Sequence, residues 1–185
     1  MFKSANHHAF WGKATEVGFT VFCMWFSMLA VIGFFKYSGL FSIDFTHNIP
    51  LLGVSANFLW LHEGSITLGQ ALMSPYVVIG VLGTVLFAPL VEEIIFRGVC
   101  GMVSDKEGTI RPRFEFLVLA VSFIAFGLAH GNWYFSIMVQ GVGGLFLARL
   151  WFRNGPNQTA SYFSCVAAHG LYNTSVVLTV WLMAS

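Results

Sequence analysis

Residues 90–97 read LVEEIIFR, so two adjacent carboxylates and one guanidinium interrupt an otherwise apolar stretch. Ionisable side chains inside hydrocarbon are costly and are usually kept there by function. Glu93 and Arg97 are four positions apart, which places them on one helix face and predicts a charge-neutralising ion pair. Glu92 points about 100° away around the helix and lacks this partner. An unpaired buried carboxylate is a candidate general acid or base.

The composition around this cluster is typical of an integral membrane protein. Hydrophobic residues make up 57% of the 185 residues and charged residues only 9%, whereas charged residues are about 25% of an average soluble domain. The net charge of +1 and the lack of basic clusters argue against nucleic acid as a partner. Cys23, Cys100 and Cys165 lie in apolar runs without disulfide or metal spacing, so we interpret them as core residues.

Further apolar stretches lie on both sides of the one that contains the cluster. A crossing needs about 20 apolar residues, so the chain can form one domain of four to six spans. After a polar lead of residues 1–13, we expect an all-α, polytopic transmembrane bundle of about five helices, at residues 17–35, 76–103, 116–130, 133–151 and 162–183. Pro89 should kink the second helix and free nearby backbone carbonyls. Gly141 and Gly144 offer a close packing face in the fourth.

Residues 36–74 are of mixed composition, and their apolar pieces are too short to cross a membrane. We expect an extramembrane or interfacial connection here, with room for a short amphipathic or re-entrant helix. The chain then divides into residues 1–75, with the first helix and this connection, and residues 76–185, the helical core. With a cytoplasmic N-terminus, five spans put the following basic residues on the inside, as the positive-inside rule requires: Lys3, Lys13, Lys106, Arg111, Arg113, Arg149 and Arg153.

Three polar groups far apart in the sequence fall at similar depths in this arrangement. At ~1.5 Å per residue, Glu92, His130 and His169 lie roughly 18, 25 and 18 Å from the cytoplasmic helix ends. Helix tilt in a hydrocarbon core about 30 Å thick can absorb the difference. Asn173 is four positions after His169 and shares its helix face. The spacing therefore predicts one polar site near mid-membrane, although a small transporter or channel with a buried proton relay would carry similar residues.

Three short motifs resemble those of the CAAX protease and bacteriocin-processing (CPBP, or Abi) family of intramembrane proteases. Residues 92–97 resemble its EExxxR motif, residues 126–130 its FxxxH motif and residues 169–173 its HxxxN motif. The resemblance extends over about residues 76–183. It implies a membrane endopeptidase that hydrolyses a peptide bond in a membrane-associated peptide or protein tail. The chain is most similar to the bacterial branch, which implies the cytoplasmic (inner) membrane of a bacterium.

The same resemblance implies a role for each motif residue. Glu92 would activate the attacking water, as in a glutamic protease, and His130 would position or polarise that water. His169 and Asn173 would stabilise the oxyanion of the tetrahedral intermediate, a task suited to preorganised donors. The supporting residues would be Glu93, Arg97 and Phe126.

Two alternatives accompany this interpretation. Glu92, His130 and His169 could supply three ligands to Zn²⁺, with water in the fourth position. However, the HExxH signature is absent, and a zinc-bound Glu92 would leave no obvious base, so a mechanism without metal or other cofactor is favoured. The second alternative is a non-catalytic, bacteriocin-immunity-type membrane protein that keeps the fold.

Overall fold

In the computed structural model, the described residues are 3–38, 74–103, 112–130, 136–154 and 158–184. The expected connection at residues 36–74, with its interfacial or re-entrant helix, lies almost wholly outside these ranges. So does the basic loop before the third helix. Only the helical core can therefore be compared with the sequence predictions, and those for the two other segments stay predictions.

All described elements are helical, as predicted. They form five stretches: α1 (Lys3–Ser38); α4 (Pro75–Leu82), continued by the π-helical turn η3 (Gly83–Phe87) and by α5 (Ala88–Val103); α6 (Pro112–Ala129); the π-helical turn η4 (Ile137–Gly141) with α8 (Val142–Arg153); and α9 (Gln158–Ala184). α1 begins inside the polar lead, because a helix need not end where its apolar segment ends.

Two of these helical stretches are long and apolar enough to cross a membrane, at Gly12–Phe35 and Val77–Gly98. Phe114–Ala129 is a shorter apolar helix. These segments are consistent with a membrane protein, while the count of five crossings stays a prediction. Large apolar side chains also cover the outside: Phe22 and Phe26 of α1 are 64% and 65% exposed. Extensive exposed apolar surface of this kind suits contact with lipid.

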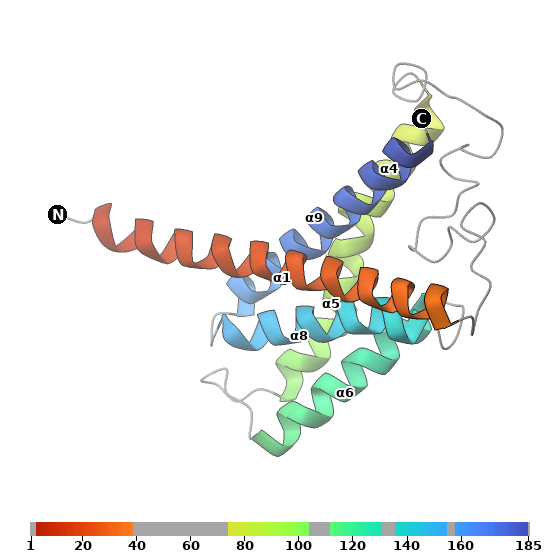
Figure 1. Cartoon of the computed structure of the whole chain (residues 1–185). Coiled ribbons are helices and arrows are strands. Elements are labelled where there is room, and N and C mark those ends of the chain that lie inside the picture. The colour runs from red at the N-terminus through yellow and green to blue at the C-terminus, as the bar shows by residue number, and fades with distance from the viewer. Residues whose placement is uncertain (1–2, 39–73, 104–111, 131–135, 155–157, 185) are drawn as a thin grey trace.

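The helices pack as crossed antiparallel pairs. α1 and α8 lie side by side and run in opposite directions, and α9 runs opposite to α4–α5, so that the start of α4 and the end of α9 are neighbours (Figure 1). α6 packs against η4 and α8. The buried core at the centre includes Met24, Phe126, Leu147, Cys165 and Ala168, which come from four of the five stretches.

Small residues bring α6 and the η4–α8 stretch into close contact. A Cβ atom added to Gly144 would lie 2.6 Å from the Cβ of Phe126. A Cβ atom on Gly141 would collide with the backbone oxygen of Phe123. Gly141 and Gly144 therefore form the close packing face that the sequence predicted. This contact places Phe126, and with it the end of α6, beside the charged cluster of α5.

Candidate active site

Glu93 and Arg97 form the predicted ion pair, and both side chains are fully buried. Arg97 Nε donates to Glu93 Oε2 at 2.8 Å, with side-chain exposures of 0% for both residues. Each charge thus has an opposite charge in contact, which is the condition for holding either in a dry interior.

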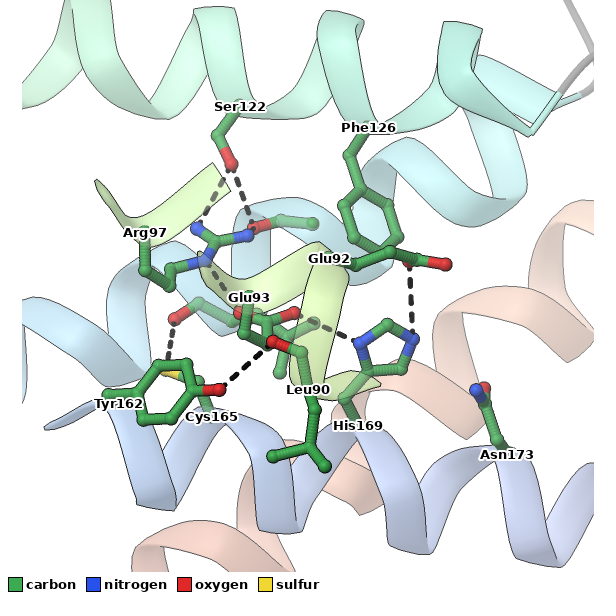
Figure 2. A network of polar contacts seen from close by, with 12 residues as sticks. Leu90, Glu92, Glu93, Arg97, Ser122, Phe126, Tyr162, Cys165, His169 and Asn173 are labelled. Atoms are coloured by element: carbon green, nitrogen blue, oxygen red, sulfur yellow. Dashed lines mark hydrogen bonds and ion pairs between the residues drawn. The ribbon is translucent and has the colours of Figure 1, made fainter. Parts of the chain in front are cut away.

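Arg97 also ties its own helix to two others. Its Nη1 donates to Ser122 Oγ of α6 at 3.1 Å, and its Nη2 to the Gly144 carbonyl of α8 at 3.4 Å (Figure 2). The Ser122 hydroxyl donates in turn to the same carbonyl at 3.3 Å. Sequence reasoning missed Ser122, although its place four residues before Phe126 put it on the face of the second motif.

Glu93 has a second contact that the sequence did not reveal. Its Oε1 lies 3.0 Å from His169 Nδ1 of α9. The ion pair with Arg97 keeps Glu93 a carboxylate, which only accepts, so His169 Nδ1 carries the proton and donates. The opposite ring nitrogen, Nε2, is thereby turned toward Glu92 (Figure 2).

His130, at the end of α6, is oriented in a similar way by a backbone carbonyl. Its Nδ1 lies 2.7 Å from the Phe126 carbonyl, which can only accept, so Nδ1 donates. Its Nε2 then faces Glu92. The Phe126 ring packs against both imidazoles, with centroids 4.7 Å from His130 and 5.5 Å from His169. Phe126 therefore supports both rings by packing against them.

Glu92 Oε2 lies between the two imidazoles. It is 3.6 Å from His130 Nε2 and 3.8 Å from His169 Nε2, beyond the usual range of a direct hydrogen bond. This oxygen is buried and has no hydrogen-bond partner within the described part of the chain. Polar groups from α5, α6 and α9 thus converge on a single carboxylate oxygen, as the depth estimate predicted.

Asn173 is held by a carbonyl that Pro89 leaves without its usual donor. In the π-helical turn η3, the Ala88 N–H donates to the Gly83 carbonyl five residues earlier. The next donor in this register is Pro89, which has no N–H for the Thr84 carbonyl. Asn173 Nδ2 donates to that carbonyl at 2.9 Å. A side-chain amide has two N–H groups, so one donor remains.

All four predicted catalytic residues, Glu92, His130, His169 and Asn173, line one cavity of about 400 Å³. Both π-helical turns contribute to its wall, through Gly83 and Thr84 of η3 and Gln140 of η4. Such turns are frequent at functional sites. Gln140 was not among the sequence candidates. Met24 of α1 also lines the cavity, so the first helix takes part in the site although the motifs lie elsewhere.

Within the described ranges, no group of three or more His, Cys, Asp or Glu side chains is arranged to hold a metal ion. The alternative in which Glu92, His130 and His169 bind Zn²⁺ therefore has no preformed site there. The three cysteines are free, with Cys100 and Cys165 buried and Cys23 partly buried.

A protein-family model described as type II CAAX prenyl endopeptidase Rce1-like matches residues 74–175. The matched region is more than half of the chain and contains all three motifs. α1, which supplies Met24 to the cavity, lies outside it. No curated protein and no solved structure shows a significant match.

Proposed function

Because the chain belongs to the Rce1-like family of type II CAAX prenyl endopeptidases, we propose that it is an intramembrane endopeptidase in which Glu92 activates a water molecule. The family, which the motifs predicted, supports a protease acting on a protein substrate. Glu92 is chosen because its Oε2 lies between the Nε2 atoms of His130 and His169. The ring of each histidine is fixed by a hydrogen bond at its other nitrogen, Nδ1.

The proposed water lies between Glu92 and His130. His130 donates through Nδ1 to the Phe126 carbonyl, so its neutral ring offers Nε2 as an acceptor. A water about 2.8 Å from both acceptors spans their 3.6 Å separation. It would donate one hydrogen to each, leaving an oxygen lone pair directed at the substrate. Glu92 then takes the proton as the water attacks.

His169 and Asn173 are the proposed donors to the oxyanion. Two carboxylates and one guanidinium leave a net charge of −1 among Glu92, Glu93 and Arg97, and a proton on His169 would neutralise it. His169 Nε2–H could then donate into the cavity while Nδ1–H stays on Glu93. The second N–H of Asn173 would donate alongside it. Fixed donors in a dry site stabilise developing negative charge without reorganisation.

The reaction runs in two steps without a covalent intermediate. The water oxygen bonds to the carbonyl carbon, the carbonyl π electrons move to its oxygen, and Glu92 holds the released proton. The carbonyl then re-forms, the carbon–nitrogen bond breaks, and Glu92 passes its proton to the leaving nitrogen. A carboxylic acid and an amine result. Glu93, Arg97 and Ser122 do not touch the reacting atoms in this scheme. Their contacts between helices orient Glu92 and His169.

The proposed substrate is a membrane-associated peptide or protein tail. The cavity, at about 400 Å³, falls in the range of small-molecule sites and accepts a few side chains, not a folded domain. Apart from its polar groups the wall is largely apolar, with Met24, Ile79 and Val139 among its residues. An apolar or lipid-bearing segment suits such a wall. A bacterial inner membrane and a cytoplasmic N-terminus remain part of this proposal.

The test compares the peptide termini of the membrane proteome between cells with the wild-type protein and cells with Glu92→Gln. The proposal predicts termini that appear only with the wild type. Glu115→Gln is the matched control, because this glutamate of α6 does not line the cavity, and it should give the wild-type pattern. Identical termini in all three strains would reject the proposal. Proton or solute movement in reconstituted liposomes would then favour a transporter, and an unchanged phenotype of Glu92→Gln a non-catalytic protein.

A further inference from the structure

A second cavity, of about 440 Å³, lies between α1 and α8 and contains none of the proposed catalytic residues. Its walls include Phe19 and Cys23 from α1 and Phe146, Arg149 and Arg153 from α8. We call it the α1–α8 groove. It lies where the two helices run side by side in opposite directions (Figure 1), so the N-terminal part of α1 meets the C-terminal end of α8.

The groove changes from charged to apolar along its length. Its charged end is marked by Glu16 and Arg153, whose Oε1 and Nη2 atoms are 3.7 Å apart. Cys23 lies seven positions after Glu16 on α1, and Phe146 lies seven positions before Arg153 on α8. Both are therefore about 10 Å further into the bundle along their helices. Phe19, on the intervening turn, is 60% exposed. A ligand that fills the groove must therefore be charged at one end and hydrocarbon at the other.

The sign of the charged end is positive. Arg149 and Arg153 line it, and Glu16 is the one carboxylate beside them among the residues that the structure describes. The Arg153–Glu16 contact is long, and the side chains are 54% and 32% exposed, so it is a weak pair that leaves Arg153 accessible. Arg149 is exposed as well. A guanidinium binds phosphate oxygens bidentately. The charged end thus favours an anionic headgroup.

We propose that the α1–α8 groove binds one anionic phospholipid, its phosphate on Arg149 and Arg153 and one acyl chain along Phe19, Cys23 and Phe146. Basic pockets between membrane helices are known to take anionic headgroups. The groove begins close to the start of the apolar segment Gly12–Phe35, which is the depth at which a lipid phosphate lies. This combination of position, charge and length favours a lipid over a protein segment or a second copy of the chain.

The bound lipid would join α1 to the family core. α1 lies outside the matched region, and Cys23 in the groove is adjacent to Met24 in the catalytic cavity. Occupancy would therefore hold the helix that forms one wall of the cavity. The inference does not rest on peptidase activity and can be tested without a substrate.

The experiment measures binding of phosphatidylglycerol to the full-length protein in detergent, by native mass spectrometry and thermal unfolding. We expect one tightly held phosphatidylglycerol and a raised melting temperature, with little effect of phosphatidylcholine or inorganic phosphate. Arg149→Gln/Arg153→Gln should weaken binding about 30-fold, equivalent to about 1 kcal/mol for each arginine near an anionic surface. The control Lys106→Gln/Arg113→Gln removes the same charge from another segment and should bind within about twofold of wild type.

Three results of this binding experiment would overturn the proposal. Equal stabilisation by inorganic phosphate would indicate a free-anion site, equal binding of phosphatidylcholine would indicate unselective lipid contact, and an equal loss in the control variant would indicate a general charge effect.

A second experiment, on cysteine labelling, covers the case in which the double variant folds poorly. Cys23 is partly exposed whereas Cys100 and Cys165 are buried, so a maleimide should label Cys23 first. Phosphatidylglycerol should slow this labelling, and an unchanged rate would contradict occupancy of the groove.

Discussion

Glu93 Oε1 lies 3.0 Å from His169 Nδ1, so the carboxylate that neutralises Arg97 also orients a candidate catalytic imidazole. The two adjacent glutamates thus have different surroundings. Glu93 is fully enclosed by charged and hydrogen-bonding partners, whereas the side chain of Glu92 is 28% exposed and borders the cavity. This difference separates a structural role for Glu93 from a chemical role for Glu92, and it makes their variants behave differently.

Glu93→Gln should destabilise the protein as well as inactivate it. The substitution leaves the buried Arg97 guanidinium without its counter-charge, which typically costs about 3–5 kcal/mol. It also removes the carboxylate that holds His169. Thermal unfolding in detergent should show a lower melting temperature than for wild type. A variant as stable as wild type would show that the Glu93–Arg97 pair is not needed for the fold.

Gly144→Ala tests the contact between α6 and α8. The added methyl group would lie 2.6 Å from the Phe126 Cβ, so the helices must separate, and overpacking of this kind costs about 1–3 kcal/mol. Gly98→Ala is the matched control, since a Cβ there meets nothing within 4 Å and alanine is the better helix former by roughly 0.5–1 kcal/mol. We expect the melting temperature to fall for the first variant and to hold or rise for the second. A melting temperature that falls for Gly98→Ala and holds or rises for Gly144→Ala would refute the packing argument.

Asn173→Ala should reduce kcat with little change in KM. The variant removes one proposed oxyanion donor, and the loss of such a donor costs about 10²–10³ in kcat. It also removes the partner of the Thr84 carbonyl, so stability should fall by about 1 kcal/mol. Kinetics with a cleaved peptide, beside thermal unfolding, separate the two effects. A raised KM at unchanged kcat would assign Asn173 to substrate binding instead.

Chelation tests the zinc alternative. If Glu92 acts as a base on water held by His130, no zinc ion is needed to activate that water. Prolonged treatment with a strong zinc chelator should then leave the cleavage rate within about twofold of the untreated enzyme, whereas an enzyme whose zinc activates the water would lose activity. The rate is measured in reconstituted liposomes before and after chelation. Loss of activity that added Zn²⁺ restores would replace the glutamate mechanism with a metal one.

The sequence could predict the helices and the contacts within each of them. Apolar stretches of sufficient length gave the helical segments around the three motifs, and the four-residue spacing of Glu93 and Arg97 gave their ion pair, because a helix fixes which positions share a face. The meeting of Glu92, His130 and His169 followed from their similar depths. The start of α1 at Lys3 did not follow, since apolarity does not limit a helix at its polar end.

Contacts between helices could not be predicted in the same way. A helix that is apolar on all sides does not reveal which face turns inward, so the pairing of Glu93 with His169, 76 positions later, had no signal in the spacing. The link from Arg97 to Ser122 depends on the same rotation. Asn173 was expected to serve the oxyanion, and its bond to the Thr84 carbonyl, which depends on the π-helical turn before Pro89, was not predicted. Pro89 predicted a kink in this helix, but it did not predict a π-helical turn.

The role of Glu92 is tested most directly by the rate at which Glu92→Gln cleaves a peptide identified from the wild-type termini, measured in reconstituted liposomes. Glutamine keeps the size of the side chain but cannot accept a proton from water, and a positioned general base contributes about 10²–10⁴ to the rate. The melting temperature should stay close to that of wild type, because Glu92 Oε2 has no direct hydrogen bond to lose within the described residues. We predict a stable protein with kcat lowered at least about 100-fold; a stable variant that cleaves within about tenfold of the wild-type rate would contradict the account.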